Sequence, residues 1–359
     1  MGVPLKNETE STPRSIKHAA PVIFQPPWYL RSGHLQTWIT GFYRPVAALP
    51  PAITHRIEIG EYGAMLIHEN SPESFGPDAP CVLLLHGLGS SHAGTYMTNI
   101  AHGLLQRGCR VFRADLPGAG PSSQTTYLPP HGACYDLIRT CLNTLSRTRD
   151  IPAWRIAGVS LGGNILLKML SRHAIHPQAH PFEFQVEYAL AVAPPIDLGA
   201  CCKNIERGIN RLYGKYFMRI LKLQTRERAA LWSQWKEVLR SADYRTIRRF
   251  DETVTAPLAG FPSAEVYYHF GSSMEDLPSI AVPTTILVDQ HDPIVPSFLF
   301  ERASYSATTR VIETQYGGHV GYLHRLSAAD GNANSRWRRW ADDHIAEELA
   351  KPTWPSQIA

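Results

Sequence analysis

The sequence predicts an α/β fold, with one mostly parallel, twisted sheet, helices on both faces and a helical insertion. From residue 80 onward, short apolar runs alternate with segments of helical periodicity, which is typical of parallel strands joined by crossover helices. The runs, such as residues 82–85, are continuously apolar, as expected of strands covered on both faces. The alternation stops near residue 197 and resumes near residue 284, which indicates an insertion between two strands.

The predicted elements begin with a proline- and aromatic-rich segment, residues 21–50, which we expect to be ordered but irregular. Alternating polar and apolar residues predict strands at 53–61 and 64–69. Further strands are expected at 82–85, 110–114, 154–159, 186–192, 284–288 and 310–313. Helices are expected at 96–106, 135–147, 161–173, 297–303 and 334–349, and in the insertion at 205–223 and 226–239.

This order of elements divides the chain into a core and two additions. Residues 1–52 are expected to form an N-terminal extension packed on the body, and residues 53–196 and 276–359 form the α/β core. Residues 197–275 form a helical cap insertion. Because open parallel sheets bind ligands at the carboxyl ends of their strands, we expect the insertion to cover that edge.

Composition excludes several classes of protein. With 359 residues, of which 44% are hydrophobic and 18% charged, the chain can bury a large core. A net charge of +4 is too small to indicate nucleic-acid binding, and the densest basic stretch, residues 336–340, is expected on the solvated face of the last helix. The sequence contains no apolar run of about 18 residues, so we expect no membrane-spanning helix. The polar N-terminus does not resemble a signal peptide.

The cysteines point to a reducing compartment. None of the six lies at a spacing typical of a metal site, and Cys81 and Cys109 fall in or beside predicted buried strands. We therefore expect a reduced, cytoplasmic protein that needs no metal and no organic cofactor.

A short motif between a predicted strand and a predicted helix carries the main chemical signal. Residues 158–162 read Gly-Val-Ser-Leu-Gly, which matches G-x-S-x-G. In that context the turn forces the serine into a strained backbone conformation, and glycines at 158 and 162 allow the strand and helix to approach closely. Ser160 is therefore the candidate nucleophile.

A serine hydroxyl needs a base that accepts its proton, and the base needs an acid that orients it. His319 lies in a glycine-rich loop just after the last strand and is the candidate base. Asp292 precedes a proline just past the preceding strand and is the candidate acid. Asp289 is the nearer alternative for the acid, and Asp197 is a more distant one.

Two backbone N–H groups are candidates for binding a developing oxyanion. Leu161 follows the nucleophile at the start of a helix, and Leu88 follows a His-Gly pair in the loop after the first apolar strand. We expect His86 in that pair to make structural hydrogen bonds rather than to take part in catalysis. The glycines of this loop do not match a phosphate-binding pattern, because no GK[ST] follows them.

These motifs resemble the YheT-like family of predicted esterases, a branch of the serine α/β-hydrolases. The resemblance covers about residues 21–345 and implies the α/β-hydrolase fold, ester hydrolysis and the triad Ser160, Asp292 and His319. It differs at residues 115–122, where the family has N-x-R-G, and at His291, where the family often has aspartate. The matching segments are Phe24-Gln25-Pro26-Pro27-Trp28, His34-Leu35-Gln36-Thr37, residues 86–90, residues 158–164, Phe250-Asp251, Thr255-Ala256-Pro257, Gly260-Phe261, Asp292-Pro293 and residues 317–321.

Some residues remain open between a structural and a functional role. His131 and Asp136 have the H-x4-D spacing of acyltransferases, although we expect a helix start there instead. His34 and Gln36 lie either near the pocket or where they fix the N-terminal segment. Insertion residues are expected to pack in a core or to line an acyl pocket: Leu212, Tyr213, Tyr216, Phe217 and Leu221.

The sequence thus predicts a serine carboxylester hydrolase that acts on short- to medium-chain acyl esters through an acyl-enzyme on Ser160. The expected partner is a small-molecule ester with an apolar acyl chain, and the oligomeric state stays open. The alternatives are a thioesterase or acyltransferase with the same triad, and a non-catalytic ligand-binding protein.

Overall fold

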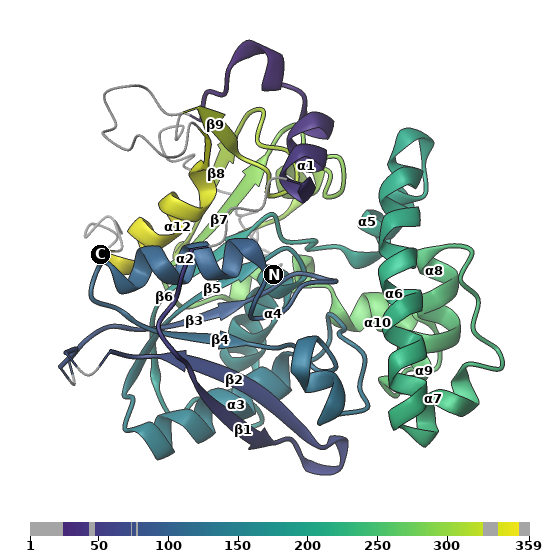
Figure 1. Cartoon of the computed structure of the whole chain (residues 1–359), viewed down its shortest axis with the longest axis horizontal. Coiled ribbons are helices and arrows are strands. Elements are labelled where there is room, and N and C mark those ends of the chain that lie inside the picture. The colour runs from purple at the N-terminus through teal and green to yellow at the C-terminus, as the bar shows by residue number, and fades with distance from the viewer. Residues whose placement is uncertain (1–23, 43–46, 73, 77, 326–336, 352–359) are drawn as a thin grey trace, which may run out of the picture.

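The structure is a computed structural model that describes residues 24–42, 47–72, 74–76, 78–325 and 337–351 (Figure 1). Its main sheet has eight strands in the order β1-β2-β4-β3-β5-β6-β7-β8. The pairs from β4 through β8 are parallel, whereas β2 pairs antiparallel with β1 and with β4, so the predicted mostly parallel sheet is confirmed. The strands are β1 (Ile53–Glu58), β2 (Ala64–Asn70), β3 (Cys81–Leu85), β4 (Arg110–Ala114), β5 (Ala153–Val159), β6 (Gln185–Val192), β7 (Thr284–Asp289) and β8 (Thr309–Thr314).

Helices cover both faces of this sheet, which explains why its central strands are apolar throughout. Alternate residues of β3 enter different cores: Leu83 and Leu85 pack with the helices of one face, and Val82 and Leu84 with those of the other. The first face carries α3 (Tyr135–Arg149) and α4 (Leu161–Ile175), and the second carries α2 (Thr95–Leu105) and α12 (Trp340–Ala350) (Figure 1). A short helix, α11 (Phe298–Arg302), links β7 and β8.

The last helix is shorter than the sequence predicts. Helix α12 begins at Trp340, because residues 337–339 form β10 (Trp337–Arg339), which pairs with β9 (Leu323–Arg325). The expected solvated position of Arg339 is wrong: its side chain is buried, pairs with Asp342 at 3.0 Å and donates to the carbonyl of Val320. Residue 336 lies outside the described residues.

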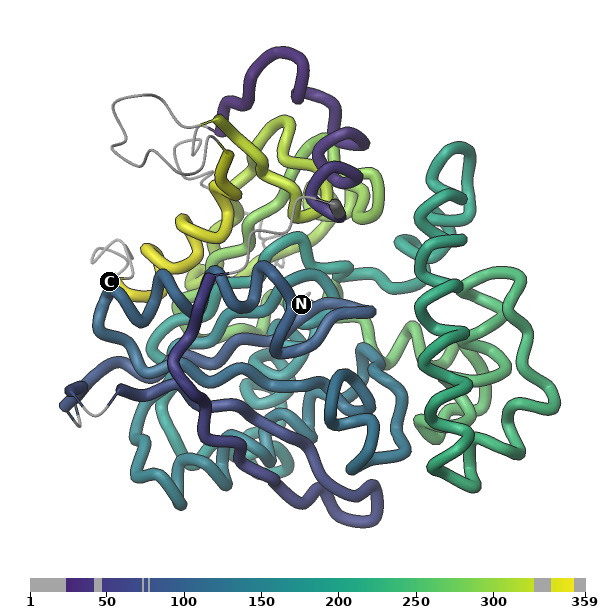
Figure 2. The backbone as a smooth tube through the Cα atoms, viewed as in Figure 1, coloured from purple at the N-terminus to yellow at the C-terminus, as the bar shows by residue number. Residues whose placement is uncertain are grey.

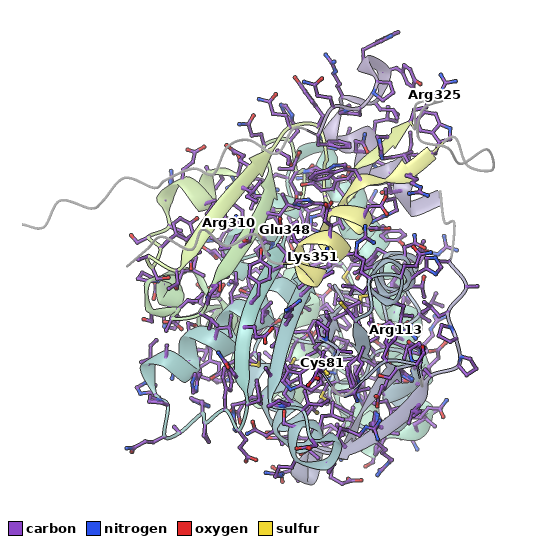
Figure 3. The ribbon with its side chains drawn as sticks, turned by 90° about the vertical axis from the view of Figure 1, so that its left-hand side faces the viewer. Cys81, Arg113, Arg310, Arg325, Glu348 and Lys351 are labelled. Atoms are coloured by element: carbon purple, nitrogen blue, oxygen red, sulfur yellow. The ribbon has the colours of Figure 1, made fainter. Side chains whose placement is uncertain are left out.

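An ion pair holds α12 against the sheet. Arg310 of β8 and Glu348 of α12, both labelled in Figure 3, lie 2.7 Å apart. The same figure places Lys351 near the end of this helix and Arg325 far from it, at the end of β9.

The N-terminal segment contains a helix that the sequence did not predict. After a short 3₁₀ turn, η1 (Trp28–Leu30), residues 33–42 form α1 (Gly33–Phe42), which lies beside the segments that follow β7 and β8 (Figure 2). The buried Gln36 side chain fixes it there by donating to the carbonyls of Leu30 and Leu323 and accepting from the Leu323 N–H. The helix carries no acidic residue in its first turn and depends on these tertiary contacts, so local signals did not reveal it.

The insertion between β6 and β7 is helical and stands beside the sheet (Figure 1). The break predicted between residues 223 and 226 is absent, because the long helix α6 (Arg211–Leu231) continues past the buried Thr225 and ends before Trp232, which is extended. Within the described residues, no helix is both long and apolar enough to cross a membrane. The elements of the insertion are α5 (Leu198–Ile205), η4 (Gly208–Asn210), α6 (Arg211–Leu231), α7 (Ser233–Val238), α8 (Ile247–Phe250), a π-helical turn η5 (Asp251–Thr255), α9 (Ala256–Leu258), α10 (Ala264–Gly271) and η6 (Met274–Ser279).

Candidate active site

Ser160 occupies a sharp turn between β5 and α4. Its backbone has φ +52° and ψ −120°, a strained conformation for a residue with a side chain. The flanking glycines permit this turn: a Cβ on Gly158 would lie 2.3 Å from the carbonyl oxygen of Gly162, and one on Gly162 would lie 2.6 Å from that of Leu85. The hydroxyl is thereby presented at the carboxyl ends of the central strands.

We expect Gly158→Ala to destabilise the protein severely, by more than about 3 kcal/mol, because the added methyl group meets backbone atoms that cannot move away. Urea unfolding of the purified variant measures this loss. Gly41→Ala in α1 is the matched control, since no atom of the described residues lies within 4 Å of its added Cβ. Equal stability of the two variants would contradict the close approach at the turn.

His319 and Asp292 complete a hydrogen-bonded chain with Ser160. The Nε2 atom of His319 lies 3.0 Å from the Ser160 Oγ, and its Nδ1 lies 2.8 Å from Oδ2 of Asp292. The other carboxylate oxygen, Oδ1, accepts the N–H groups of Ile294 and Val295 at 2.7 and 2.9 Å. The structure therefore brings together the three residues that the sequence singled out, from the turn after β5 and from the loops after β7 and β8.

Helix α1 braces the two loops that carry the candidate acid and base. The Thr37 hydroxyl accepts the backbone N–H of His319 at 2.9 Å. Gly33 packs so closely on the acid loop that an added Cβ would lie 1.8 Å from the carbonyl oxygen of His291. Thr37 belongs to the segment His34-Leu35-Gln36-Thr37, which matches the family that the sequence resembles. That match was the sequence feature that could have indicated this role.

The alternative acids have other partners. Asp289 accepts hydrogen bonds from the backbone of His291, Gly317 and Gly318 and from the Thr314 hydroxyl, so it shapes the loop that carries His319. Burial raises the pKa of Asp289 to about 6 despite these bonds. Asp197 caps α5 by accepting from the Ala200 N–H at 2.9 Å.

The candidate oxyanion donors flank Ser160. Leu161 is the first residue of α4, where N–H groups have no partner within the helix, and Leu88 lines the cavities that also contain Ser160. His86 is fully buried, contacts the Gly87 carbonyl through Nδ1 and accepts the Leu116 N–H through Nε2. These are the structural hydrogen bonds that we expected of His86, and burial lowers its pKa, which favours the neutral imidazole.

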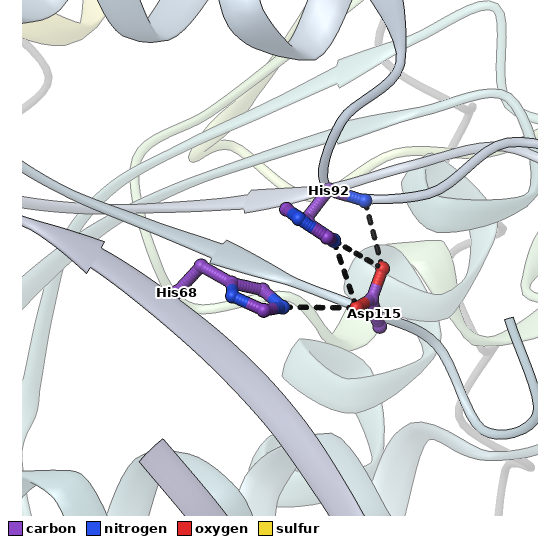
Figure 4. Close-up of side chains that lie close together, drawn as sticks. All are labelled: His68, His92 and Asp115. Atoms are coloured by element: carbon purple, nitrogen blue, oxygen red, sulfur yellow. Dashed lines mark hydrogen bonds and ion pairs between the residues drawn. The ribbon is translucent and has the colours of Figure 1, made fainter. Parts of the chain in front are cut away.

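A buried cluster of two histidines and an aspartate anchors the loop between β3 and α2 (Figure 4). His68 Nε2 and His92 Nδ1 lie 3.0 and 2.9 Å from Oδ2 of Asp115, and Oδ1 accepts the His92 N–H at 2.8 Å. Burial alone would raise the pKa of Asp115, but hydrogen bonds from both histidines lower it to about 2. The ligand-type atoms of the three residues lie within 4.8 Å of one another, and both histidines bond to Asp115, so the cluster holds the loop that carries Leu88.

Two cavities meet at Ser160. The inner cavity lies under the insertion, has a mostly apolar lining and is partly open to solvent. The outer cavity contains His319 and the Gly87–Tyr96 side of the site. Of the insertion residues considered in the sequence, Tyr213 and Tyr216 line the outer cavity, Leu221 the inner one and Phe217 both. Leu212 lines neither and is 45% exposed.

The residues left open by the sequence have structural surroundings. Asp136 bonds Arg139 and His180, whereas the buried His131 lies against aromatic rings, and burial lowers its pKa to about 4. His34 stacks on Tyr213 and contacts its hydroxyl at 2.9 Å, which joins the N-terminal segment to the insertion.

Asp251 carries a half-buried carboxyl in the inner cavity wall, and the Phe-Asp pair of the family resemblance was its only sequence signal. Burial raises the pKa of Asp251 to about 6, although Tyr268 donates to it at 2.7 Å. Because the folded protein binds this proton more tightly than the unfolded chain does, the protonated carboxyl stabilises the fold at pH values below the ordinary carboxyl pKa. This stabilisation is lost as the pH rises through 6.

We therefore expect Asp251→Asn to remove about 1 kcal/mol of the stability difference between pH 5 and pH 8. Urea unfolding of both proteins at the two pH values measures this change. Glu265→Gln, at an exposed carboxylate of the same insertion, should keep the wild-type pH dependence. A variant at 251 whose pH dependence matches the wild type would show that Asp251 titrates normally.

Comparisons with known proteins agree with this architecture. The sequence pattern of the alpha/beta hydrolase family matches residues 82–331. The Escherichia coli protein YheT is 26% identical over 301 residues, 81% of this chain and 84% of that relative. A monoacylglycerol lipase of Saccharomyces cerevisiae is 29% identical over 293 residues, 78% of this chain and 61% of the relative. The human phospholipase ABHD3 is 23% identical over 336 residues, 88% of this chain and 78% of the relative.

A solved structure supports the fold independently. The crystal structure of a 2,6-dihydroxy-pseudo-oxynicotine hydrolase matches with a TM-score of 0.54 at 18% identity, covering 88% of this chain and 71% of that chain. The predicted fold, the predicted enzyme class of hydrolase and the resemblance to YheT are confirmed. The chain belongs to the α/β-hydrolase family.

Proposed function

We propose that the protein is a serine carboxylester hydrolase in which Ser160 is the nucleophile, His319 the general base and acid, and Asp292 the residue that orients His319. The observation that carries this proposal is the continuous hydrogen-bonded chain from Ser160 Oγ through His319 to Asp292. Two of the relatives are named as a lipase and a phospholipase, which supports an ester bond as the bond that this protein cleaves.

The first half of the reaction forms an acyl-enzyme. His319 Nε2 accepts the hydroxyl proton of Ser160 as Oγ attacks the ester carbonyl carbon. The carbonyl π electrons move to oxygen, and the N–H groups of Leu88 and Leu161 stabilise the resulting oxyanion. When the tetrahedral intermediate collapses, the C–O bond to the alcohol breaks, and His319 gives its proton to the departing alkoxide oxygen.

The second half of the reaction releases the acid. A water molecule gives a proton to His319 Nε2 as its oxygen attacks the acyl carbon, and collapse returns the proton to Ser160 Oγ. Asp292 accepts the Nδ1–H throughout, which holds the imidazole tautomer and stabilises the imidazolium. Because Ile294 and Val295 donate to its other oxygen, the carboxylate keeps a fixed orientation during both halves.

The inner cavity suits an apolar acyl chain of short to medium length. Its lining is mostly apolar and includes Leu88, Phe217 and Leu221, beside Ser160. We propose that residues 197–275 act as a cap that encloses this chain. The six unpaired, buried cysteines support a reducing compartment such as the cytoplasm.

A panel of 4-nitrophenyl esters from acetate to dodecanoate tests the proposal. We expect kcat/KM to rise from acetate to a medium-chain ester and to fall for the longest chains, and the Ser160→Ala protein should be inactive on all of them. Repeating the assay with acyl thioesters and with added alcohol acceptors separates an esterase from a thioesterase and an acyltransferase. Tight binding of an ester that is never cleaved by the native protein would contradict the proposal and favour a ligand-binding protein.

A further inference from the structure

A buried arginine lines the inner cavity with part of its hydrogen-bonding capacity unused. Arg228 of α6 is 2% exposed and lines the same cavity as Ser160. One of its terminal nitrogens donates to the Gly118 carbonyl, and its guanidinium carbon lies 5.0 Å from the centre of the Trp235 ring. Its Nε–H is buried and has no partner among the described residues.

The charge of this arginine is not balanced by an ion pair. Burial lowers the pKa of Arg228 to about 10, so the guanidinium stays charged at neutral pH. The charge of Glu227, its exposed neighbour in the chain, raises the pKa of Arg228 slightly against the effect of burial. No described carboxylate forms an ion pair with Arg228. By contrast, the buried Arg339 does form an ion pair, with Asp342. A buried cation without a counter-ion is costly, and an anionic ligand in the cavity would relieve that cost.

Asp251, the acidic residue in the cavity lining, does not serve as this counter-ion. Asp251 accepts from Tyr268, and the cation that acts on it is Arg248 rather than Arg228. The lining of the inner cavity also includes the apolar side chains of Leu221 and Phe217. A ligand that fills the cavity therefore contacts the nucleophile, apolar side chains and a cationic group.

We propose that the inner cavity selects esters whose apolar portion ends in an anionic oxygen group, which binds the guanidinium of Arg228. This inference rests on the proposed esterase function and adds the substrate class. Carboxylate and phosphate oxygens share the required chemistry, because either can accept N–H donors of a guanidinium. The proposal assigns Arg228 to substrate binding, whereas Ser160 and His319 carry the chemistry.

Two matched pairs of substrates test the proposal and separate its two possible anions. The first pair is the mono-4-nitrophenyl ester of adipic acid against 4-nitrophenyl hexanoate, which differ by a carboxylate at the end of the acyl chain. The second is the 4-nitrophenyl ester of 6-phosphonooxyhexanoic acid against 4-nitrophenyl hexanoate, which differ by a phosphate at the end of the acyl chain. We expect the wild-type protein to prefer the anionic member of at least one pair by about tenfold or more in kcat/KM.

Variants at position 228 connect this preference to the guanidinium. Arg228→Met should abolish the preference, mainly through a higher KM for the anionic substrate, while the neutral substrate is affected much less. Arg228→Lys should retain part of it, because lysine keeps the charge but loses the planar fork. Arg226→Met is the matched control, since Arg226 lies on the same helix but is exposed and lines neither cavity. It should keep the wild-type preference.

The outcomes separate this inference from the proposed function. Neutral esters hydrolysed as well as anionic ones by the wild type would overturn the role of Arg228 and leave the esterase intact, even if the 228 variants failed to fold. Equal losses for both members of a pair in Arg228→Met would show a purely structural residue. No hydrolysis of either member by folded wild-type protein would overturn both proposals together.

Discussion

Ser160→Ala is expected to lower kcat for ester hydrolysis by roughly four to six orders of magnitude without changing stability. The activity is lost because alanine has no oxygen that can attack the ester carbonyl. The stability should hold because Ser160, although it precedes α4, makes no side-chain capping hydrogen bond to that helix. Steady-state hydrolysis of a medium-chain 4-nitrophenyl ester and thermal unfolding measure the two effects.

Ser263→Ala is the matched control for this prediction. Ser263 does cap a helix, because its hydroxyl accepts the Val266 N–H at the start of α10. We expect this variant to lose about 1 kcal/mol of stability and to keep its kcat. Activity in Ser160→Ala above about 1% of wild type would contradict the role of Ser160 as nucleophile.

Asp289, the last residue of β7, and Asp292, in the loop after it, are expected to give opposite phenotypes. Asp292→Asn should lower kcat by about 10⁴-fold at nearly unchanged stability. One amide oxygen can still accept from Ile294 and Val295, which places the NH₂ group against Nδ1 of His319. That amide favours the tautomer with the proton on Nε2, which cannot accept the proton of Ser160.

Asp289→Asn should instead lower stability, by about 2–4 kcal/mol. Both oxygens of Asp289 accept hydrogen bonds, so an NH₂ group in place of one oxygen faces donors. Its kcat should fall less than that of Asp292→Asn. Chemical denaturation and saturating kinetics on both variants check the contrast, and a larger loss of kcat at 289 than at 292 would contradict the assignment of the acid.

Much of the fold and the candidate site could be predicted because their signals are local in the sequence. Continuous apolar runs such as β3 appear only where both faces are covered, and the glycines at 158 and 162 mark a turn that other residues would block. His319 and Asp292 stand out because each follows a strand end, where parallel strands bring distant residues to one edge.

The features that were missed depend on contacts between distant segments. Helix α1 is held by Gln36 against Leu323, and nothing in residues 33–42 alone indicates that partner. Arg228 is an ordinary residue of a helical pattern until packing against Gly118 and Trp235 buries it in a cavity wall. Arg339 looked solvated for the same reason, because its burial depends on packing that brings it to Asp342 and to the Val320 carbonyl.

Labelling with a fluorophosphonate probe, followed by peptide mapping, tests most directly whether the fold activates Ser160. The account predicts a label on Ser160 in native wild-type protein, and none in heat-denatured protein or in Ser160→Ala. His319→Ala should also label far more slowly, because the base that accepts the hydroxyl proton is gone. A folded wild-type protein that stays unlabelled at Ser160, or a label on another residue that persists in Ser160→Ala, would contradict it.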